Sequence, residues 1–405
     1  KTEASRGNMD YWVVKLNADG SKVWDKTYGG SENEWLAKVI ATSDGGFLLG
    51  GYSYSGVSGD KTEASKGSAD YWLVKLNSNG SKVWDKAYGG AEYDELTTLT
   101  ESQGGGFLLG GRSLSGVSGD KTEASRGNAD YWLVRVDNNG SKVWDKTYGG
   151  SGVDWLHSLV ETRSGEFVLG GTSDSGIGGE KTAASKGAAD YWVIKINANG
   201  SKVWDKTYGG SGLDDFRTLI ITPDEGYLLG GTSESGVSGD KTEASRGNKD
   251  SWVLKLDTEG NKTWDRTYGG RGDEWVASLL STTDGGYLLG GGSNSGPNGD
   301  KTEASKGGFD FWLVKLSSDG TKAWDKAFGG TGDDWIESMI IASDGNYVLS
   351  GASDSGISGD KSEASRGLKD FWVLKANVST LSAGAPGKES QSLTVYPNPS
   401  RGDFN

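Results

Sequence analysis

Short runs in which apolar and polar residues alternate, separated by turn-forming residues, recur along almost the whole chain. In the first stretch these runs cover residues 11–16, 22–28, 35–42 and 47–52. Each run predicts a β-strand. The segments Asn-Ala-Asp-Gly and Ser-Asp-Gly-Gly between them are typical of tight hairpin turns, because glycine adopts positive φ and aspartate bonds to nearby backbone amides. No segment shows an apolar period of 3.6 residues, so the pattern predicts an all-β protein.

The pattern repeats every 60 residues without drift. Near-copies of Lys-Thr-Glu-Ala-Ser-Arg-Gly begin at Lys1, Lys61, Lys121, Lys181, Lys241, Lys301 and Lys361. Four short antiparallel strands per repeat predict a blade of a β-propeller. We expect the strands of a blade to run from inner to outer edge in the order 35–42, 47–52, 71–76 and 82–88. The first two are the most apolar and glycine-rich, whereas the last is half charged.

The number of strands bears on the number of blades. One strand of the repeat occurs seven times, marked by Trp12, Trp72, Trp132, Trp192, Trp252, Trp312 and Trp372, whereas the other three occur six times. Because a closed ring leaves no exposed sheet edge, we favour seven blades, with strands of one blade supplied by residues before Lys1. The alternative is six blades with a surplus terminal strand. Since residue 1 is not Met, we expect the chain to be part of a longer precursor.

Three segments of the repeat carry a family resemblance. They are Asp-Gly-Gly-Phe-Leu-Leu-Gly-Gly from Asp44, Asp-Tyr-Trp-Leu-Val-Lys-Leu from Asp70, and Asn-Gly-Ser-Lys-Val-Trp-Asp-Lys-Ala-Tyr-Gly-Gly from Asn79. In order and spacing they resemble the repeat of bacterial seven-bladed β-propellers found in extracellular proteins. The resemblance covers residues 1–377 and implies a fold more than a function.

The period stops after Asn377, and two further segments follow. Residues 378–392 are rich in Ser, Gly and Ala and predict a flexible linker. Residues 393–405 resemble the opening strand of the C-terminal sorting domain used by the type IX secretion system of Bacteroidetes-like bacteria. The resemblance rests on Tyr396, Pro397, Asn398, Pro399, Gly402 and Phe404. It implies the type IX translocon and its sorting-domain receptor as partners. It also implies passage through the periplasm to secretion or to the outer-membrane surface.

Composition excludes some partners. The chain has 405 residues, no Cys and a formal net charge of −14. An acidic surface repels phosphate backbones, so we expect no nucleic-acid partner. No apolar run approaches the 18 or more residues of a membrane-spanning helix, so we expect no membrane span. Without disulfides, stability depends on packing, and we expect Trp12, Trp24 and their equivalents to pack between sheets.

Two sets of equivalent positions at the beginning of the innermost strand differ from blade to blade. The first set is Trp35, Glu95, Trp155, Asp215, Trp275 and Trp335, and the second, two residues on, is Ala37, Thr97, His157, Arg217, Ala277 and Glu337. Residues two apart in a strand share one side of the sheet. We therefore interpret some of these residues as binding a glycan or a surface protein: Trp35, Trp155, Trp275, Trp335, His157, Arg217 and Glu337. The alternative is that the Trp residues merely pack against the neighbouring blade.

Acidic residues precede the first set in every repeat, at Glu34, Asp94, Asp154, Asp214, Glu274 and Asp334. A ring of carboxylates is a weak candidate for a metal site, and Ca²⁺ is the cofactor that it would suit. We favour the alternative, in which each carboxylate accepts backbone N–H bonds at an interblade turn. The charged loop that ends at Asp10 and its equivalents predicts a scaffold of ion pairs, with a multivalent surface as the alternative.

Catalytic signals are few. His157 is the only histidine and has no counterpart in other repeats, and there is no Cys. A serine triad or a zinc site needs more such residues than this. We therefore predict no catalytic residues and a secreted or cell-surface module for binding or adhesion. The alternative is a polysaccharide-active enzyme or the accessory propeller domain of one.

Overall fold

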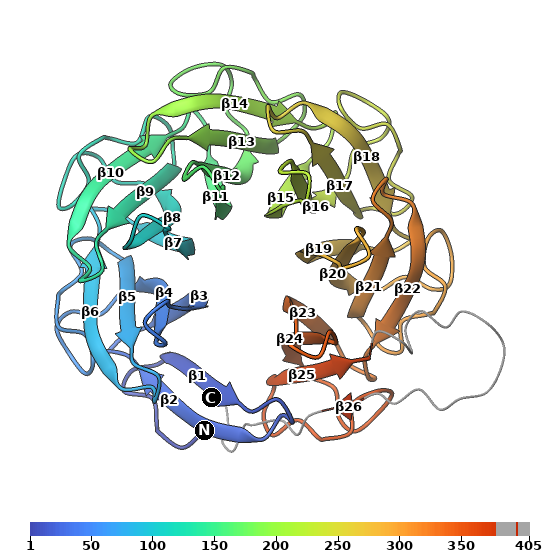
Figure 1. Ribbon diagram of the computed structural model, residues 1–405, viewed down its shortest axis with the longest axis horizontal. Coiled ribbons are helices and arrows are strands. Elements are labelled where there is room, and N and C mark those ends of the chain that lie inside the picture. The colour runs from blue at the N-terminus through green and yellow to red at the C-terminus, as the bar shows by residue number, and fades with distance from the viewer. Residues whose placement is uncertain (378–393, 396–405) are drawn as a thin grey trace. The chain divides into compact units, whose positions relative to one another are not determined.

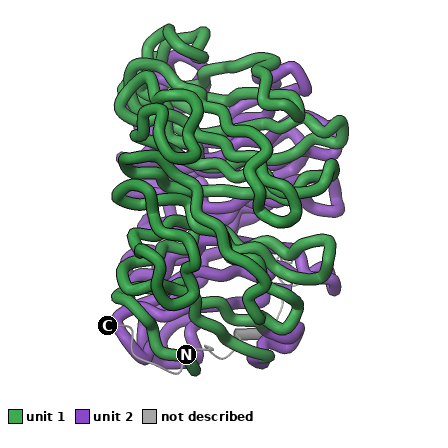
Figure 2. The backbone as a smooth tube through the Cα atoms, turned by 90° about the vertical axis from the view of Figure 1, so that its left-hand side faces the viewer, with its two compact units in different colours: residues 1–15, 23–209 green, residues 16–22, 210–405 purple. Residues whose placement is uncertain are grey.

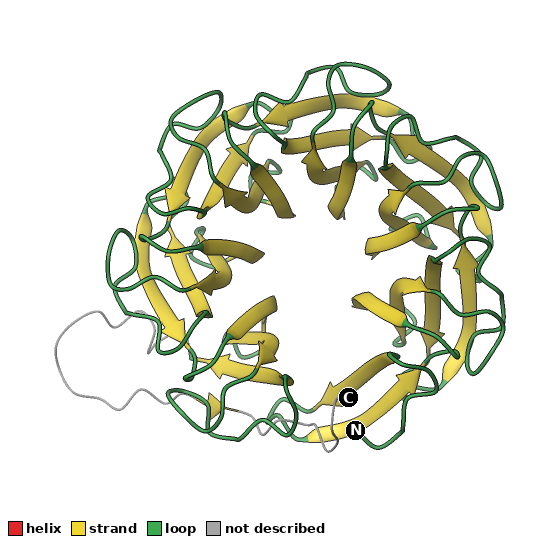
Figure 3. Ribbon diagram, turned by 180° about the vertical axis from the view of Figure 1, so that it is seen from behind, coloured by secondary structure: helices red, strands yellow, loops and turns green. Residues whose placement is uncertain are grey.

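The computed structural model describes residues 1–377 and 394–395, and these contain β-strands and no helix (Figure 3). The strands form six four-stranded antiparallel sheets and one two-stranded sheet. β1 (Tyr11–Leu16) and β2 (Lys22–Tyr28) make the two-stranded sheet. The predicted fold class is confirmed: the protein is all-β, a β-propeller of four-stranded antiparallel blades.

Each four-stranded blade takes its strands in chain order (Figure 1). The first three blades contain β3 (Glu34–Ala41), β4 (Phe47–Ser53), β5 (Asp70–Leu76) and β6 (Lys82–Tyr88); β7 (Asp94–Glu101), β8 (Phe107–Ser113), β9 (Asp130–Val136) and β10 (Lys142–Tyr148); and β11 (Asp154–Glu161), β12 (Phe167–Ser173), β13 (Asp190–Ile196) and β14 (Lys202–Tyr208). The next three contain β15 (Asp214–Ile221), β16 (Tyr227–Ser233), β17 (Asp250–Leu256) and β18 (Lys262–Tyr268); β19 (Glu274–Ser281), β20 (Tyr287–Ser293), β21 (Asp310–Leu316) and β22 (Lys322–Phe328); and β23 (Asp334–Ile341), β24 (Tyr347–Ser353), β25 (Asp370–Ala376) and β26 (Thr394–Val395).

The chain divides into two compact units, which Figure 2 colours separately. The first unit comprises residues 1–15 and 23–209, and the second comprises residues 16–22 and 210–405. Within the first unit, β7 contacts β3, β4 and β5 of the preceding blade, and within the second unit β19 contacts β15, β16 and β17. Neighbouring blades therefore pack face to face, and their first strands meet, as expected for the inner edge of a propeller blade.

The structure corrects the favoured blade count. The described residues form six four-stranded sheets, as in the six-bladed alternative, and the surplus is a two-stranded sheet rather than a single strand. The last blade has its fourth strand because Val395 and Thr394 pair with Leu374 and Lys375 of β25. That pairing covers the edge of β25 with a segment whose sequence resembles the opening of a sorting domain.

A β-bulge interrupts the first strand of every four-stranded blade. In β11, Leu156 pairs with Gly171 and Ser158 pairs with Gly170, so that His157 is the extra residue. The backbones approach so closely here that a Cβ on Gly171 would lie 2.0 Å from the carbonyl oxygen of Trp155. The glycine at this position is therefore a requirement of the bulge, and it is kept as Gly351 in the last blade, where Ser350 replaces the glycine before it.

Buried aromatic residues join consecutive blades. In the first unit Trp72, Trp132 and Trp192 are fully buried. The hydroxyl of Tyr71 donates to the carbonyl oxygen of Trp132 at 3.0 Å, and the two ring centres are 4.8 Å apart. The expectation that these tryptophans pack between sheets is confirmed. The same hydrogen bond and ring contact recur for Tyr11 with Trp72 and for Tyr131 with Trp192, so successive blades of the first unit are positioned in the same way.

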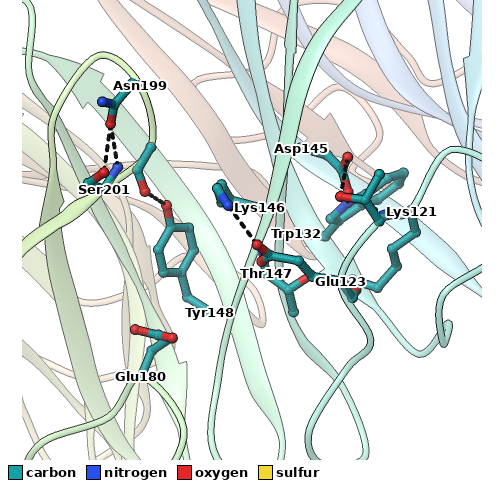
Figure 4. A network of polar contacts seen from close by, with 12 residues as sticks. Lys121, Glu123, Trp132, Asp145, Lys146, Thr147, Tyr148, Glu180, Asn199 and Ser201 are labelled. Carbon is teal, nitrogen blue, oxygen red and sulfur yellow. Dashed lines mark hydrogen bonds and ion pairs between the residues drawn. The ribbon is translucent and has the colours of Figure 1, made fainter.

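The charged loop between the second and third strands forms a polar network (Figure 4). Lys121 is buried, donates to Thr147 Oγ1 at 2.7 Å and lies 5.3 Å from the centre of the Trp132 ring. Trp132 Nε1 donates to Asp145 at 3.2 Å, and Glu123 accepts the backbone N–H of Thr147 at 2.9 Å. These are the contacts of the predicted scaffold.

Candidate ligand-binding sites

Constant and variable residues alternate where the first and second strands of a blade meet. The constant residues make a buried polar clasp: Glu34 accepts hydrogen bonds from Gly30 N at 2.8 Å, Ser53 Oγ at 2.8 Å and Ser55 Oγ at 2.5 Å. The intervening positions carry Trp35, Tyr52 and Tyr54 in this blade; the position of Trp35 is Trp in four of the six blades, and those of Tyr52 and Tyr54 carry other residues elsewhere. Because side chains alternate across a strand, the constant residues form the scaffold and the variable ones form a separate face.

The six carboxylates considered as metal ligands belong to this scaffold. Each is buried, and each accepts the backbone N–H of a glycine four residues earlier at 2.6–2.8 Å. They are Glu34, Asp94, Asp154, Asp214, Glu274 and Asp334. These are the bonds expected from the interpretation favoured above. Within residues 1–377 and 394–395, no group of three or more His, Cys, Asp or Glu residues is arranged to hold a metal ion.

In the first unit the variable positions form a continuous aromatic patch. Trp35 stacks on Tyr52, with ring centres 6.4 Å apart and planes 13° apart, and Tyr52 lies edge-on to Tyr93 at 5.8 Å. Tyr54 contacts both tyrosines. Trp35 is 47% exposed and Tyr54 is 39% exposed. We call this the aromatic patch and define it as Trp35, Tyr52, Tyr54, Tyr93, Arg112 and Trp155.

Arg112 connects the aromatic patch to the next blade. Its guanidinium carbon lies 3.9 Å from the centre of the Trp155 ring and 5.8 Å from that of Tyr93. The same guanidinium forms an ion pair of 2.7 Å with Glu95, which also accepts the hydroxyl of Tyr93 at 3.2 Å. A cation held between aromatic faces and a carboxylate gains from both interactions at once.

The second unit has a charged pocket of about 220 Å³ at its variable positions. Its lining residues are Leu213, Asp215, Arg217, Thr232, Glu234, Lys249, Asp273, Glu274 and Trp275. Two ion pairs cross it, Arg217–Asp215 at 3.3 Å and Lys249–Glu234 at 3.0 Å. The indole of Trp275 packs against Phe309, with ring centres 4.6 Å apart.

The structure thus divides the predicted ligand-binding residues between several places. Trp35 and Trp155 belong to the aromatic patch, and the ring of His157 lies 4.7 Å from that of Trp155. Arg217 and Trp275 line the charged pocket. Trp335 has Lys369 Nζ 3.7 Å from the centre of its ring, and Glu337 is exposed on β23. The sorting-signal residues, from Tyr396 to Phe404, lie outside the described residues.

The sequence analysis did not single out several residues of these sites. They are Tyr52, Tyr54, Tyr93 and Arg112 in the first unit, and Leu213, Thr232, Glu234, Lys249 and Asp273 in the second. The sequence does contain a signal for some of them: the positions of Tyr93, Arg112 and Tyr54 also differ between repeats, while their neighbours stay constant. The sequence analysis used two variable positions of the repeat, whereas the charged pocket brings six together, those equivalent to residues 9, 33, 35, 37, 52 and 54.

No helix in the described part of the chain is long and apolar enough to cross a membrane. No protein-family model matches the sequence. The chain is 26% identical over 398 residues to the regulatory protein FlaEY of Caulobacter vibrioides, covering 90% of this chain and 41% of FlaEY. It therefore spans less than half the length of that relative.

Solved structures offer only distant similarities. Hydrazine synthase of Kuenenia stuttgartiensis is 10% identical with a TM-score of 0.48, covering 86% of this chain and 80% of the other. A protein of unknown function from Dyadobacter fermentans is 12% identical with a TM-score of 0.45, covering 86% of this chain and 95% of the other. None of these similarities assigns a function to this chain.

Proposed function

We propose that this chain is a binding module of the cell surface or of the secreted fraction, and that the aromatic patch of the first unit holds a polysaccharide. One observation carries the proposal. Large aromatic side chains occupy positions that differ from blade to blade, directly beside positions that do not. Single exposed apolar side chains are common, but a contiguous patch in which Trp35 and Tyr54 are exposed beside the half-buried Tyr52 and Tyr93 is typical of an interaction site.

The chemistry of the patch suits a sugar chain. A flat aromatic ring offers an apolar face to the C–H face of a pyranose, and a tyrosine hydroxyl at its edge can hydrogen-bond to sugar hydroxyls. Trp35 and Tyr54 are exposed, while Glu95 and Arg112 supply charged hydrogen-bonding groups beside them. Small-molecule binding sites are usually lined by aromatic and apolar side chains with a few polar groups among them.

The proposal is tested by screening the purified chain against a polysaccharide array and measuring each hit by calorimetry. We expect Trp35→Ala and Tyr54→Ala to weaken the affinity at least tenfold without a large change in Tm. Val83→Ala is the control, because Val83 is also an exposed apolar residue but lies on β6 and makes no part of the patch. Binding of no polysaccharide, or unchanged affinity in both patch variants, would overturn the proposal. Release of shortened products would favour the enzyme alternative.

We further propose that the chain is exported by the type IX system, on the strength of the resemblance carried by Tyr396 to Phe404. The test is to remove residues 396–405, with any sequence that follows them, from the precursor. This deletion keeps β26, so the last blade retains its fourth strand. We expect a folded propeller that accumulates in the periplasm. Delivery to the surface at the level of the intact precursor would contradict type IX export.

A further inference from the structure

The two units differ at one equivalent interface between blades. In the first unit, the guanidinium of Arg112, near the end of β8, lies on the indole of Trp155 in the next blade and pairs with Glu95 on the neighbouring strand of its own blade. The chain therefore supplies its own cation to a site made of one indole and one carboxylate. Planar guanidinium groups suit such a site, because they stack on aromatic faces and bind carboxylates through two N–H groups.

The second unit repeats this interface 120 residues later, with the indole and a carboxylate in the same places but several other side chains changed, among them Leu213 for Tyr93, Arg217 for Thr97 and Asp273 for Val153. Trp275 stands where Trp155 does, and Asp215 stands where Glu95 does. Arg112 is replaced by Thr232, whose side chain is too short to reach the indole. The charged pocket of about 220 Å³ lies at this interface, lined by Thr232, Asp215 and Trp275. The indole and a carboxylate are thus retained, while the guanidinium at the position of Arg112 is replaced by Thr232, and Asp215 pairs instead with Arg217 at 3.3 Å.

The charges around the pocket favour a cation. Its lining contains the carboxylates of Asp215, Glu234, Asp273 and Glu274 and the cations Arg217 and Lys249. Arg217 and Lys249 pair with Asp215 and Glu234, and Glu274 accepts bonds from Gly270 N and Ser293 Oγ. Asp273 Oδ1 is buried and accepts no hydrogen bond within the described residues. A buried carboxylate oxygen without a donor costs free energy, which a ligand N–H group would recover.

We propose that the charged pocket binds a guanidinium group from an external ligand, in the place that Arg112 takes in the first unit. The group stacks on Trp275 and donates to Asp215 and Asp273. The volume is below that of a pocket for a drug-sized ligand, and it suits one side chain of a longer ligand. This site is separate from the aromatic patch and goes beyond the proposed polysaccharide binding.

The first test compares two probes on the unmodified chain by calorimetry. N-acetyl-arginine methylamide carries the guanidinium, and the citrulline analogue has the same shape but a neutral urea. We expect the arginine probe to bind at least tenfold more tightly, with an affinity that falls as salt concentration rises. Equal binding of the two probes, or no binding of the arginine probe, would overturn the proposal. This comparison needs no variant and is independent of folding effects.

A reciprocal pair of variants supplies the second test. Thr232→Arg gives the second unit its own guanidinium, so we expect the arginine probe to bind at least tenfold more weakly. Arg112→Thr opens the equivalent space in the first unit beside Trp155 and Glu95, so we expect a second molecule of probe to bind there, more weakly because Val153 stands where Asp273 does. The Tm of each variant is measured alongside. Unchanged affinity and unchanged stoichiometry in folded variants would contradict the equivalence of the two interfaces.

Polysaccharide binding separates this proposal from the previous one. Thr232→Arg lies outside the aromatic patch and leaves polysaccharide affinity unchanged, while Trp35→Ala leaves the affinity for the arginine probe unchanged. If the unmodified chain binds the arginine probe but no polysaccharide, the proposed function fails and this inference stands. If it binds a polysaccharide but not the arginine probe, this inference fails and the proposed function stands.

Discussion

The two units share one scaffold and differ in what they place upon it. Trp132 donates to Asp145 at 3.2 Å in the first unit, and Trp252 donates to Asp265 at 3.2 Å in the second. Beside these pairs, Lys121 and Lys241 each donate to a threonine hydroxyl at 2.7 Å. Above this common frame, one unit presents an aromatic patch with a bound internal cation and the other presents a charged pocket.

The difference shows how a repeat protein diversifies. Blades contact mainly their neighbours, so the scaffold contacts can stay constant while a few columns of each repeat change. Replacing Arg112 by the threonine found at position 232 alters a side chain at the rim of an interface, not the tryptophan that holds the interface together. Both proposed binding sites therefore lie at the variable positions of the repeat rather than on the constant scaffold.

The largest expected effect is on stability and separates scaffold from site. Trp132→Ala and Trp252→Ala each remove a fully buried indole and its hydrogen bond, so we expect a loss of about 3–5 kcal/mol in either unit. Trp155→Ala and Trp275→Ala remove partly exposed indoles and are expected to cost about 1–2 kcal/mol. Denaturant unfolding measures all four. Equal losses in both classes would mean that Trp155 and Trp275 are packing residues only.

The next effect is on the pH dependence of stability, and it comes from one buried lysine in each unit. Burial lowers the pKa of Lys121 and of Lys241 to about 8, while an unfolded lysine keeps its pKa near 10.4. Between these values the unfolded state binds more protons, so the free energy of unfolding rises with pH from about 8 to 10. The carboxyl of Asp130, which faces Lys121, has a pKa raised to about 6 by burial and is ionised throughout this window.

The pH effect is measured by denaturant unfolding at several pH values. Each lysine should contribute a rise of about 1 kcal/mol per pH unit. We expect Lys121→Met and Lys241→Met to reduce the slope by equal amounts, since the two scaffolds match. A stability that is flat or falls between pH 8 and 10 in the unmodified chain would contradict this, and unequal slopes would show that the scaffolds differ.

A smaller effect on the free energy of unfolding distinguishes the arginine of the aromatic patch from the arginine of the charged pocket. The side chains of Arg112 and Glu95 are 24% and 13% exposed, and the guanidinium also stacks on Trp155. We expect Arg112→Ala to cost about 1–2 kcal/mol. The pair of Arg217 and Asp215 is more exposed, so Arg217→Ala should cost less than about 0.5 kcal/mol. A cost for Arg217→Ala as large as that for Arg112→Ala would mean that the pocket is held together by its own ion pair.

The strands could be predicted from the sequence because the same pattern occurs in every repeat. Residues 35–42 were expected as a strand, and β3 spans Glu34–Ala41. The alternation of buried and exposed residues and the glycine-containing turns are local properties, so they locate strands well. The bulge in each first strand is not local, since it depends on how closely a glycine of the neighbouring second strand approaches.

The sites could be predicted only in part. Trp155 and Trp275 stood out as variable aromatic residues, but their partners come from the preceding blade, and contacts between blades depend on packing that one strand pattern does not specify. Thr232 is the clearest example, because its role comes from the space that it leaves, and a small residue attracts no notice in a sequence. The pairing of Thr394 with Lys375 was equally inaccessible, since it lies beyond the repeat.

The smallest expected effect is that of metal removal, and it tests whether the scaffold carboxylates behave alike in both units. Asp154 accepts bonds from Gly150 N at 2.8 Å and Ser175 Oγ at 2.9 Å, and Glu274 accepts bonds from Gly270 N at 2.8 Å and Ser293 Oγ at 2.6 Å. Because such donors stabilise a buried carboxylate without a cation, we expect EDTA to leave the Tm unchanged within error. A large drop in Tm that Ca²⁺ restores would assign a cation to these carboxylates.

Glu274 also lines the charged pocket. Ca²⁺ bound at Glu274 would therefore also weaken binding of the arginine probe, and calorimetry with and without Ca²⁺ measures this effect.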